Sequence, residues 1–457
     1  MNFIPNNINL HQKFISGTEK HILMITNHGT HQWDVVPGLT DTGGQNIFVN
    51  QFTASLVQFG FRITIVNRGG YRHPVIGKIQ EGVDYLDERR RIVYISDSRK
   101  TFVRKEDMAG RIPELAHSLW KFLNDENSFP DLIISHYWDG AMLGIEINKR
   151  IKTRVKHVWV PHSLGHVKMK NMPPETWGSL RIDERINCER EIVETVDTVA
   201  YTSSLIRKSL EDDYGCTDSL FLPPCIDTSR YYRREISVDN GIWSFLSKLS
   251  GLPAQKIRQC RIITEISRTD HTKRKDVLLK IFSLVLKKYP DTFLVVAIDK
   301  NEEKLYTELL ELIDDLKITD HVAVIGNEKA RMPLIYSITS AYCSPSIMEG
   351  FGMSVQEAAA TRVPVVGSML IPFVKEYLIG DTGKIVQDET LETDSVVIGD
   401  GAFMVKPDYI EGFTWALEKL FEDSNLYERM SEAVYSLTIP YFTWKDMTEV
   451  FLTEINW

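Results

Sequence analysis

The sequence predicts an α/β protein with two domains, each built on a doubly wound parallel sheet. Short apolar runs alternate with helical patterns along most of the chain, and strands that alternate with helices form parallel βαβ units. The alternation restarts after a polar stretch that begins at Pro223-Pro224, which indicates a linker. The length of 457 residues fits two or three domains.

The first domain is predicted from six short apolar runs bounded by polar residues, which is typical of buried strands. A glycine-containing loop follows the first run, and a helical pattern through Phe52, Leu56 and Phe59 follows the loop. The predicted strands span residues 21–26, 62–66, 91–95, 131–135, 155–160 and 198–202.

The second domain is predicted from five more such runs after the polar linker at residues 227–240. An acidic stretch without clear periodicity, residues 380–399, is expected to be a surface insertion. We therefore place the first two domains at residues 1–222 and 223–436. The predicted strands of the second span residues 261–264, 292–297, 322–325, 341–343 and 363–366.

Composition narrows the function classes. The formal net charge of −9 argues against a non-specific nucleic-acid surface and against an anionic membrane surface as partner. The five cysteines are widely spaced and form no CxxC pair, which favours reduced thiols and offers no zinc site. Residues 1–20 lack the features of a signal peptide, and no apolar run approaches the ~20 residues that span a bilayer. A cytoplasmic protein without an integral membrane segment is expected.

Ligands of open parallel sheets bind beyond the carboxyl ends of the strands, so the loops there should carry the chemistry. In Asp41-Thr-Gly-Gly-Gln45, Gly43 and Gly44 let the backbone approach a ligand, and the following helix N-terminus suits a phosphate or a sugar hydroxyl. This loop is neither a GxGxxG motif nor a P-loop, and a simple tight turn is the alternative. In Pro161-His-Ser-Leu-Gly-His166, His162 follows a strand end and would hydrogen-bond a sugar hydroxyl, unless it only shapes the loop.

A basic loop follows the first strand of the second domain. It reads Ser267-Arg-Thr-Asp-His-Thr-Lys273. Arg268 and Lys273 would clamp a diphosphate there and stabilise the charge that builds on it as a leaving group. The alternative is a solvated basic loop.

The segment Glu349-Gly-Phe-Gly-Met-Ser-Val-Gln-Glu357 is the most distinctive motif of the chain. Its glycines allow an irregular loop, and the helix that begins near Ser354 offers its amides to a phosphate. Glu349 and Glu357 each suit a vicinal diol, because a carboxylate accepts hydrogen bonds in pairs. An ordinary capped helix with surface acids is the alternative.

With these motifs, the sequence resembles the retaining two-domain glycosyltransferases of the GT-B fold (family 4, glycosyl transferases group 1), and among them the sucrose-phosphate and mannosylfructose-phosphate synthases. The resemblance runs from about His21 to the end of the chain. It implies two Rossmann-like domains that face each other across a cleft, and a C-terminal helix, residues 437–457, that crosses back to the first domain. Other stretches that fit are 135–139, 185–189, 223–227 and 267–270.

The resemblance implies roles for residues on the donor side. Arg268 and Lys273 match the pair that holds the donor diphosphate. Glu357 matches the acid that binds the nucleotide ribose, and Glu349 matches the acid near the hydroxyls of the transferred hexose. His162 matches the active-site histidine near the primary hydroxyl of that hexose. The other matched positions, where the backbone meets the hexose, the phosphates or the base, are Gly43, Gly44, Ile325, Gly326, Phe351, Gly352, Met353 and Ser354.

A phosphorylated acceptor would need cations from the first domain. A solvated charged loop is the alternative for each candidate cation. Gln45 and Asp139 are further candidates for contact with the acceptor. The candidate cations are Lys100, Arg104, Lys105, Lys168 and Arg185.

The resemblance implies a retaining hexosyltransferase that moves a hexose, such as glucose from UDP-glucose, from a nucleoside diphosphate sugar to a sugar or sugar phosphate. It implies no metal, no tightly bound cofactor and no protein nucleophile. Its partners are small-molecule substrates, and the oligomeric state stays open. Cys225 replaces the usual glycine and residues 368–376 replace a glycine-rich loop, so the donor and the acceptor stay open. Alternatives are a GDP-mannose donor, a trehalose or glucosylglycerol product, a nucleotide-sugar epimerase, and a non-catalytic nucleotide-sugar-binding module.

Overall fold

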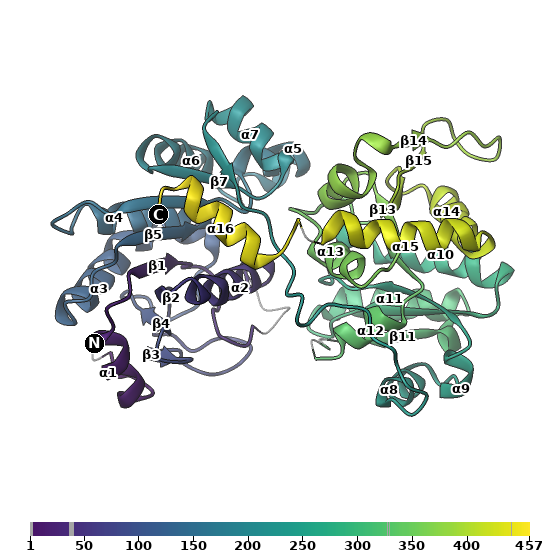
Figure 1. Ribbon diagram of the computed structural model, residues 1–457, viewed down its shortest axis with the longest axis horizontal. Coiled ribbons are helices and arrows are strands. Elements are labelled where there is room, and N and C mark those ends of the chain that lie inside the picture. Colours follow the sequence, from purple (N-terminus) through teal and green to yellow (C-terminus); the bar gives the residue numbers. More distant parts are fainter. Residues whose placement is uncertain (1–2, 36–40, 327, 329, 440) are drawn as a thin grey trace. The chain divides into compact units, whose positions relative to one another are not determined.

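The computed structural model describes residues 3–35, 41–326, 328, 330–439 and 441–457. The chain divides into two compact units, which Figure 1 shows in colours that follow the sequence. Unit 1 comprises Met1–Pro223 and Trp444–Trp457, and unit 2 comprises Pro224–Thr443. The chain therefore leaves unit 1 next to the boundary predicted after residue 222, and it enters unit 1 again at Trp444 rather than at residue 437.

The described part of unit 1 contains one mixed sheet. Its strands are β1 (His21–Ile25), β2 (Arg62–Arg68), β3 (Gly82–Tyr85), β4 (Arg90–Ile95), β5 (Leu132–His136), β6 (Lys156–Val160), β7 (Thr198–Tyr201) and β8 (Ser219–Phe221). They lie in the order β3-β4-β2-β1-β5-β6-β7-β8. Strand β3 pairs antiparallel with β4 at the edge, and the strands from β4 to β8 pair in parallel. The six predicted strands are present, and the short edge strands β3 and β8 were not predicted.

Helices cover both faces of this sheet. They are α1 (Ile8–Ser16), α2 (Gly44–Gln58), α3 (Ile112–Asp125), α4 (Tyr137–Asn148), α5 (Gly165–Asn171), α6 (Ile182–Thr195), α7 (Ser204–Tyr214) and α16 (Trp444–Glu454). Side chains alternate along each strand, so Leu23 and Ile25 join a core that also contains residues of α3 and α4. Met24 points the other way, and its sulfur accepts the hydroxyl of Thr53 on α2 at 3.1 Å. Helix α1 lies in the polar N-terminal stretch, for which no helix was predicted from the sequence.

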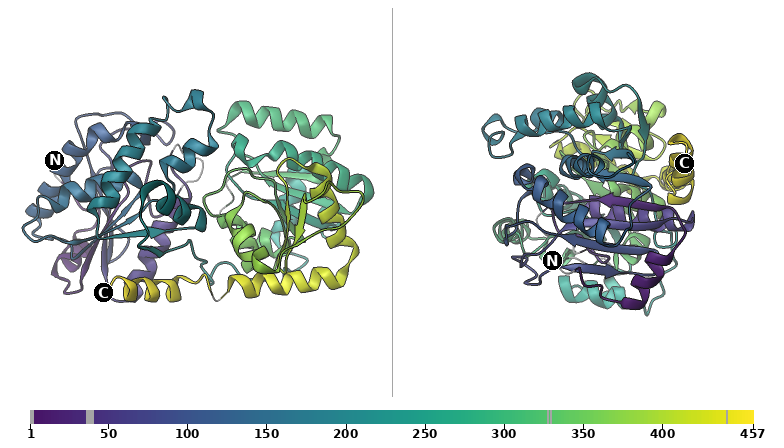
Figure 2. Two further views of the ribbon diagram at one scale, coloured as in Figure 1. Left: turned by 90° about the horizontal axis from the view of Figure 1, so that it is seen from above. Right: turned by 90° about the vertical axis from the view of Figure 1, so that its left-hand side faces the viewer.

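The C-terminal helix α16 packs on α2 within unit 1. Trp444 stacks on Phe52 with 5.5 Å between the ring centroids, and Phe451 meets the same ring edge-on. The hydroxyl oxygens of Ser55 and Thr448 lie 2.7 Å apart. Figure 2 shows this helix in yellow beside the letter C, lying against unit 1. The predicted return of the C-terminal helix to the first domain is confirmed.

The described part of unit 2 also contains one mixed sheet. Its strands are β9 (Arg261–Glu265), β10 (Thr292–Ala297), β11 (Val322–Ile325), β12 (Ala341–Ser344), β13 (Val365–Ser368), β14 (Lys384–Ile385), β15 (Val396–Ile398) and β16 (Ala402–Val405). They lie in the order β11-β10-β9-β12-β13-β16-β15-β14. The five predicted strands are present. The stretch predicted to be an insertion adds β14 and β15 as an antiparallel edge, and β16, a parallel neighbour of β13, was not predicted.

The helices of unit 2 are α8 (Gly241–Ser250), α9 (Ala254–Ile257), α10 (Lys275–Lys288), α11 (Glu303–Asp315), α12 (Met332–Ile338), α13 (Met353–Ala360), α14 (Ile410–Glu422) and α15 (Ser424–Thr438). Helices α10, α11 and α14 share one core with alternate strand residues such as Leu294 and Val296. Helix α8 contacts the edge strand β11, and α13 contacts α15. In each unit, helices pack on a largely parallel sheet, which confirms the predicted α/β fold class.

Candidate active site

The candidate residues form one group in each unit. In unit 2, the loop after β9 carries Arg268 and Lys273, and the loop after the adjacent strand β12 carries Glu349. In unit 1, the loops after the neighbouring strands β1, β5 and β6 carry the other motifs. Because neighbouring parallel strands end at the same edge of a sheet, the loops within each unit converge.

Lys273 joins the two motifs of unit 2. Its ammonium group lies 2.6 Å from Oε1 of Glu349 and donates to the carbonyl oxygen of Met348 at 2.9 Å. The amide of Ile347 donates to the carbonyl of Thr272 at 2.8 Å, so the backbone ties the two loops together as well. Lys273 is buried. Its positive charge is therefore held beside Glu349, the first residue of the motif.

Arg268, in the same loop, remains largely exposed. Its side chain keeps 66% of its surface in solvent, and its ion pair with Asp270 is 3.7 Å long. Asp270 caps the short helix η4 (His271–Lys273), because its Oδ1 accepts the amide of Thr272 at 2.9 Å. An exposed guanidinium beside a fixed ammonium group is suited to an incoming diphosphate.

Gly352 sets the turn into α13. Its φ of +109° lies in the left-handed region, and a Cβ added there would lie 2.8 Å from Cγ2 of Ile371. Only glycine adopts this conformation without strain. The predicted irregular loop and helix start are therefore present: the helix begins at Met353, followed by Ser354.

The unusual segment 368–376 packs against this loop. The amide of Phe373 donates to the carbonyl of Phe351 at 2.8 Å, and the two rings lie 5.4 Å apart. The ring of Phe351 is buried, so this residue cannot present its side chain to a ligand. Where the family has a glycine-rich loop, this chain supports the motif with aromatic packing.

Glu357 lies on α13 and is partly exposed. The hydroxyl of Tyr336 donates to its Oε2 at 2.9 Å, and Tyr231 donates to the same carboxyl group. Burial raises the pKa of Glu357 to about 7, although both tyrosines act to lower it. One turn earlier, the hydroxyl oxygens of Ser354 and Tyr342 lie 2.8 Å apart.

Ile325 and Gly326, the two positions predicted to meet the nucleotide base, differ in their surroundings. Ile325 is fully buried in β11, and its carbonyl already accepts the amide of Ile298 at 2.8 Å. Gly326 follows the strand, and a Cβ added to it would meet open space. Of these two residues, Gly326 is the one whose surroundings leave room for a ligand.

In unit 1, two histidines meet at the ends of β5 and β6. Nε2 of His162 lies 2.9 Å from Nδ1 of His136, and the rings stack 5.2 Å apart. His162 has a φ of +54°, and Phe48 of α2 meets its ring edge-on. Burial lowers the pKa of His162 to about 3. The imidazole is therefore neutral near pH 7 and acts as a hydrogen-bonding group rather than as a cation.

His28 and Asp139 form a second hydrogen-bonded pair, which bears on the predicted role of Asp139. Asp139 is fully buried, and its Oδ1 lies 2.8 Å from Nδ1 of His28. The predicted contact of Asp139 with an acceptor is therefore indirect in this structure, because His28 covers the carboxylate. Sequence reasoning missed His28, although its place directly after β1 was a usable signal. Gly29 follows it with φ +67°, and a Cβ there would lie 2.2 Å from the carbonyl oxygen of Asp41.

The loop at residues 41–45 leads into α2. The amide of Gly43 donates to Oδ1 of Asn46 at 2.9 Å, and Gly44 is the first residue of the helix. Gln45 donates through Nε2 to the hydroxyl of Thr26 at 3.0 Å. The loop thus presents a helix N-terminus at the carboxyl end of β1, as predicted.

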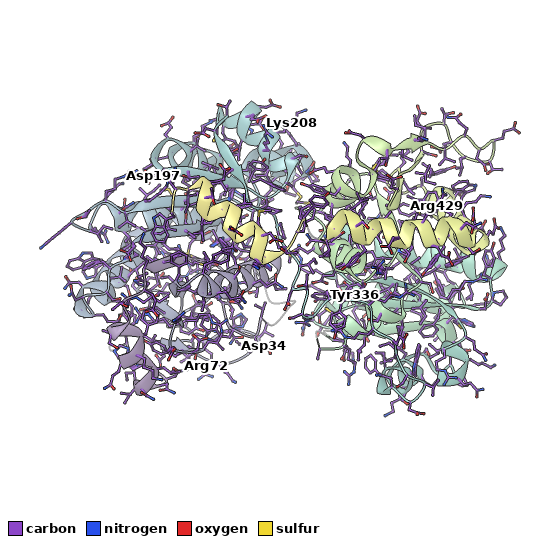
Figure 3. All side chains as sticks on the ribbon, viewed as in Figure 1. Asp34, Arg72, Asp197, Lys208, Tyr336 and Arg429 are labelled. Atoms are coloured by element: carbon purple, nitrogen blue, oxygen red, sulfur yellow. The ribbon has the colours of Figure 1, made fainter. Side chains whose placement is uncertain are left out.

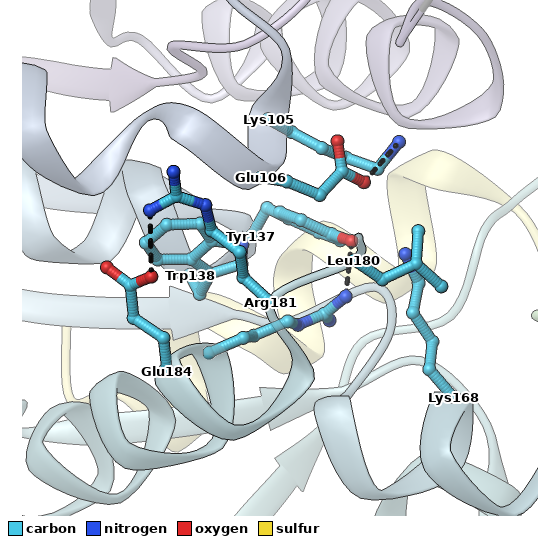
Figure 4. Close-up of a pocket in the computed structure, with 9 residues that line it drawn as sticks. Lys105, Glu106, Tyr137, Trp138, Lys168, Leu180, Arg181 and Glu184 are labelled. Carbon is cyan, nitrogen blue, oxygen red and sulfur yellow. Dashed lines mark hydrogen bonds and ion pairs between the residues drawn. The ribbon is translucent and has the colours of Figure 1, made fainter. Parts of the chain in front are cut away.

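Unit 1 also contains a small basic pocket, drawn in Figure 4. Three of its cations, Lys105, Lys168 and Arg185, were candidates for binding an acceptor phosphate. Burial lowers the pKa of Lys168, and the nearby cations Arg185 and Lys105 lower it further. For Lys105 burial has the same effect, but the carboxylate of Asp41 more than offsets it. The lining residues are Lys105, Glu106, Tyr137, Trp138, Lys168, Leu180, Arg181, Glu184 and Arg185.

The two arginines of this pocket differ. Arg185 is buried and donates to Oε1 of Glu189 at 2.7 Å and to the carbonyl of Ser163 at 2.5 Å, so it holds the loop of His162. Arg181 keeps half of its side chain exposed and pairs with Glu184 at 3.2 Å. Sequence reasoning missed Arg181, because no motif surrounds it.

The remaining acceptor candidates lie outside the lining of this pocket. Lys100 donates to the carbonyl of Asp97 at 3.0 Å. Arg104 is about half exposed and pairs with Glu106 at 3.2 Å. In the described ranges no group of three or more His, Cys, Asp or Glu side chains is arranged to hold a metal ion, and no described helix is long and apolar enough to cross a membrane.

Comparisons with known proteins match both units. The family model described as Glycosyltransferase Family 4 matches residues 42–230, and the model described as Glycosyl transferases group 1 matches residues 255–437. Mannosylfructose-phosphate synthase of Agrobacterium fabrum is 25% identical over 463 residues, covering 96% of this chain and 92% of the relative. A probable sucrose-phosphate synthase of Thermosipho melanesiensis is 24% identical over 447 residues, covering 91% of each.

Solved structures agree on the fold. Sucrose-phosphate synthase from Thermosynechococcus elongatus superposes with a TM-score of 0.76 at 18% identity, covering 96% of this chain and 98% of that chain. The HepE protein of Anabaena in complex with UDP and glucose superposes with a TM-score of 0.67 at 14% identity, covering 96% of this chain and 100% of that chain. The chain therefore belongs to the glycosyltransferases that these two family models describe, and it has their two-domain GT-B fold.

Proposed function

We propose that the protein transfers a hexosyl residue, such as glucose from UDP-glucose, to a sugar phosphate and retains the configuration at the anomeric carbon. The observation that carries this proposal is the meeting of Lys273 and Glu349. The ammonium group of Lys273, 2.6 Å from the Glu349 carboxylate, brings a phosphate-binding cation next to a hydroxyl-binding acid, as a nucleoside diphosphate hexose would require. A carboxylate accepts hexose hydroxyls, and an ammonium group takes phosphate oxygens.

The chemistry then rests on leaving-group stabilisation. Lys273 and the exposed Arg268 neutralise the diphosphate as the glycosidic bond breaks. The acceptor hydroxyl attacks the same face and gives its proton to a departing phosphate oxygen. Positioning does the rest, and neither a protein nucleophile, a metal nor a bound cofactor takes part.

The basic pocket supports a phosphorylated acceptor. Lys105, Lys168 and Arg181 bring three cations to a pocket that also contains a buried arginine. Arg185 and Lys105 disfavour the charged form of the buried Lys168, and a bound phosphate would relieve that repulsion. The relatives named above are synthases of phosphorylated sugars by name, and further relatives carry the name D-inositol 3-phosphate glycosyltransferase.

The histidines of unit 1 support a sugar at this end of the sheet. His162 and His28 are each hydrogen-bonded through one ring nitrogen. Among the residues that the structure describes, the other nitrogen of each ring has no hydrogen-bond partner and can donate to or accept from a sugar hydroxyl. Because the imidazole of His162 is neutral, it can serve a hydroxyl without competing for phosphate.

The test incubates the protein with each combination of several sugar nucleotides and several acceptors and measures the nucleoside diphosphate that is released. The proposal expects release that depends on both substrates. Proton NMR of the product should show the anomeric coupling of the donor, and an inverted coupling would contradict retention. Consumption of the donor without release of nucleoside diphosphate would instead indicate an epimerase.

A further inference from the structure

Glu357 is enclosed by tyrosines in a way that a surface acid would not need. Tyr336, on α12, is completely buried, and Tyr231 is 6% exposed. Their rings meet edge-on with 6.0 Å between the centroids. Figure 3 labels Tyr336 among the side chains of unit 2. Two separate segments of the unit therefore bring phenol groups to one carboxyl.

Both hydroxyls point at this carboxyl. Tyr336 donates to Oε2 at 2.9 Å, and Tyr231 donates to the same group. A buried phenol needs an acceptor for its proton, and a carboxylate has four lone-pair sites. Two phenols therefore leave further sites vacant while they fix the rotation of the group. Glu357 itself is only partly buried, so the vacant sites remain within reach of a ligand.

We propose that Tyr231 and Tyr336 are positioning residues that orient the carboxyl group of Glu357 toward the vicinal diol of the nucleotide ribose. This inference rests on the proposed function, because it presumes that the donor is a nucleotide sugar. The tyrosines touch neither the hexose nor the diphosphate in this arrangement, and they act through Glu357.

The same tyrosines also favour the ionised form of the carboxyl. Burial raises the pKa of Glu357 to about 7, and the two hydroxyl donors and Arg230 oppose that effect. The other ionisable groups that face these residues are Asp227, beside Tyr231, and Tyr342, beside Tyr336. Removal of one hydroxyl donor should therefore raise the pKa of Glu357 further, since a hydrogen bond to the charged form favours that form.

The test measures binding of UDP, ADP and GDP by calorimetry between pH 6 and pH 9, in the unaltered protein and in the variants Tyr336→Phe and Tyr231→Phe. Phenylalanine keeps the ring and removes only the donor. We expect each variant to bind the preferred nucleotide about tenfold more weakly, as for the loss of a hydrogen bond to a charged group. The pH below which affinity falls should also move upward, which a purely structural defect would not produce.

Tyr289→Phe is the matched control. Tyr289 also donates to a carboxylate of unit 2, Glu422, at 2.6 Å, but on the exposed surface. This variant should bind nucleotide like the unaltered protein. Unchanged affinity and an unchanged pH profile in both Tyr336→Phe and Tyr231→Phe would overturn the inference alone. Absence of binding of all three nucleotides to the unaltered protein would remove the proposed function, and this inference with it.

Discussion

The two units hold their polar residues in opposite ways. In unit 2 the candidate groups are charged: Lys273 pairs with Glu349, and Arg268 is exposed beside them. In unit 1 the candidate groups include two buried histidines, and the cations line a separate pocket whose Arg185 supports the loop of His162. Charges at strand ends suit a diphosphate leaving group, whereas neutral imidazoles suit sugar hydroxyls. Under the proposed function, unit 2 binds the donor and unit 1 the acceptor, and the two units differ in the charge of their candidate residues on the same sheet architecture.

Loss of Lys273 should have the largest effect on activity. Lys273→Ala removes the fixed charge that stabilises the leaving group, so kcat should fall by about 10²–10³-fold. Steady-state kinetics with a saturating donor measures this. Lys304→Ala, at a lysine on α11 that is 90% exposed, is the control and should leave kcat unchanged. An unchanged kcat in Lys273→Ala would show that the charge of Lys273 does not stabilise the leaving group.

The next largest effect is expected from Gly352→Ala. The new side chain meets Ile371 and forces a backbone of φ +109°, a strain of about 1–3 kcal/mol. We expect kcat/KM for the donor to fall by roughly tenfold or more, together with a lower free energy of unfolding. Gly241→Ala is the matched control, because a Cβ there meets open space. Equal behaviour of the two variants would show that the turn before α13 does not matter.

A smaller and more selective effect is expected in unit 1. Arg181→Ala should raise KM for a sugar phosphate about tenfold, as for the loss of one charge-assisted hydrogen bond, and leave KM for the donor unchanged. Arg207→Ala is the control, since Arg207 is an exposed arginine of α7 that, like Arg181, pairs with a glutamate on its own helix or at its start. A rise in the donor KM of Arg181→Ala would contradict the division between the units.

The buried histidines predict a pH effect on stability rather than on activity. Burial lowers the pKa of His157 to about 3, and its Nε2 lies 2.7 Å from the hydroxyl of Ser135. In the unfolded chain His157 takes up a proton near pH 6.5, whereas in the folded chain it stays neutral until about pH 3. The free energy of unfolding therefore decreases as the pH falls from 6.5 toward 3. One such histidine contributes up to about 1.4 kcal/mol per pH unit in that window.

Urea unfolding at several pH values between 4 and 7 measures this slope. His157→Gln should make the slope shallower, whereas His117→Gln, at an exposed position of α3, should not. Glu357 in unit 2 acts in the opposite direction. Its pKa is raised to about 7, so its contribution is present at low pH and is lost as pH rises from about 4.5 through 7. A steeper slope in His157→Gln would contradict the assignment.

The repetitive part of the fold could be predicted from the sequence. Eleven apolar runs were predicted as strands, and each corresponds to a strand of the two sheets. What escaped prediction lacks that signal. Strand β3 carries a polar residue at its centre, and helix α1 lies in an Asn-rich stretch. Strand β16 directly follows the acidic hairpin, whose composition masked the apolar run at Ala402–Val405.

The candidate site was predictable as motifs but not as contacts. The motif glycine Gly352 occupies a backbone conformation that demands glycine. Pairings across long separations, such as Lys273 with Glu349, follow from strand order, which the sequence does not reveal. The burial of Asp139 behind His28 also depends on tertiary packing. Arg181 belongs to no motif and becomes a candidate only through its place in the pocket.

The most direct test of the division between the units compares fructose 6-phosphate with fructose as acceptors, with UDP-glucose as donor. We expect release of UDP with a kcat/KM at least about 100-fold higher for the phosphorylated sugar, since two or more charge-assisted hydrogen bonds to the phosphate would be lost with fructose. Arg181→Ala should narrow that ratio, whereas Lys273→Ala should lower both rates and leave the ratio unchanged. Equal kcat/KM values for the two sugars in the unaltered protein would show that the basic pocket of unit 1 does not bind an acceptor phosphate.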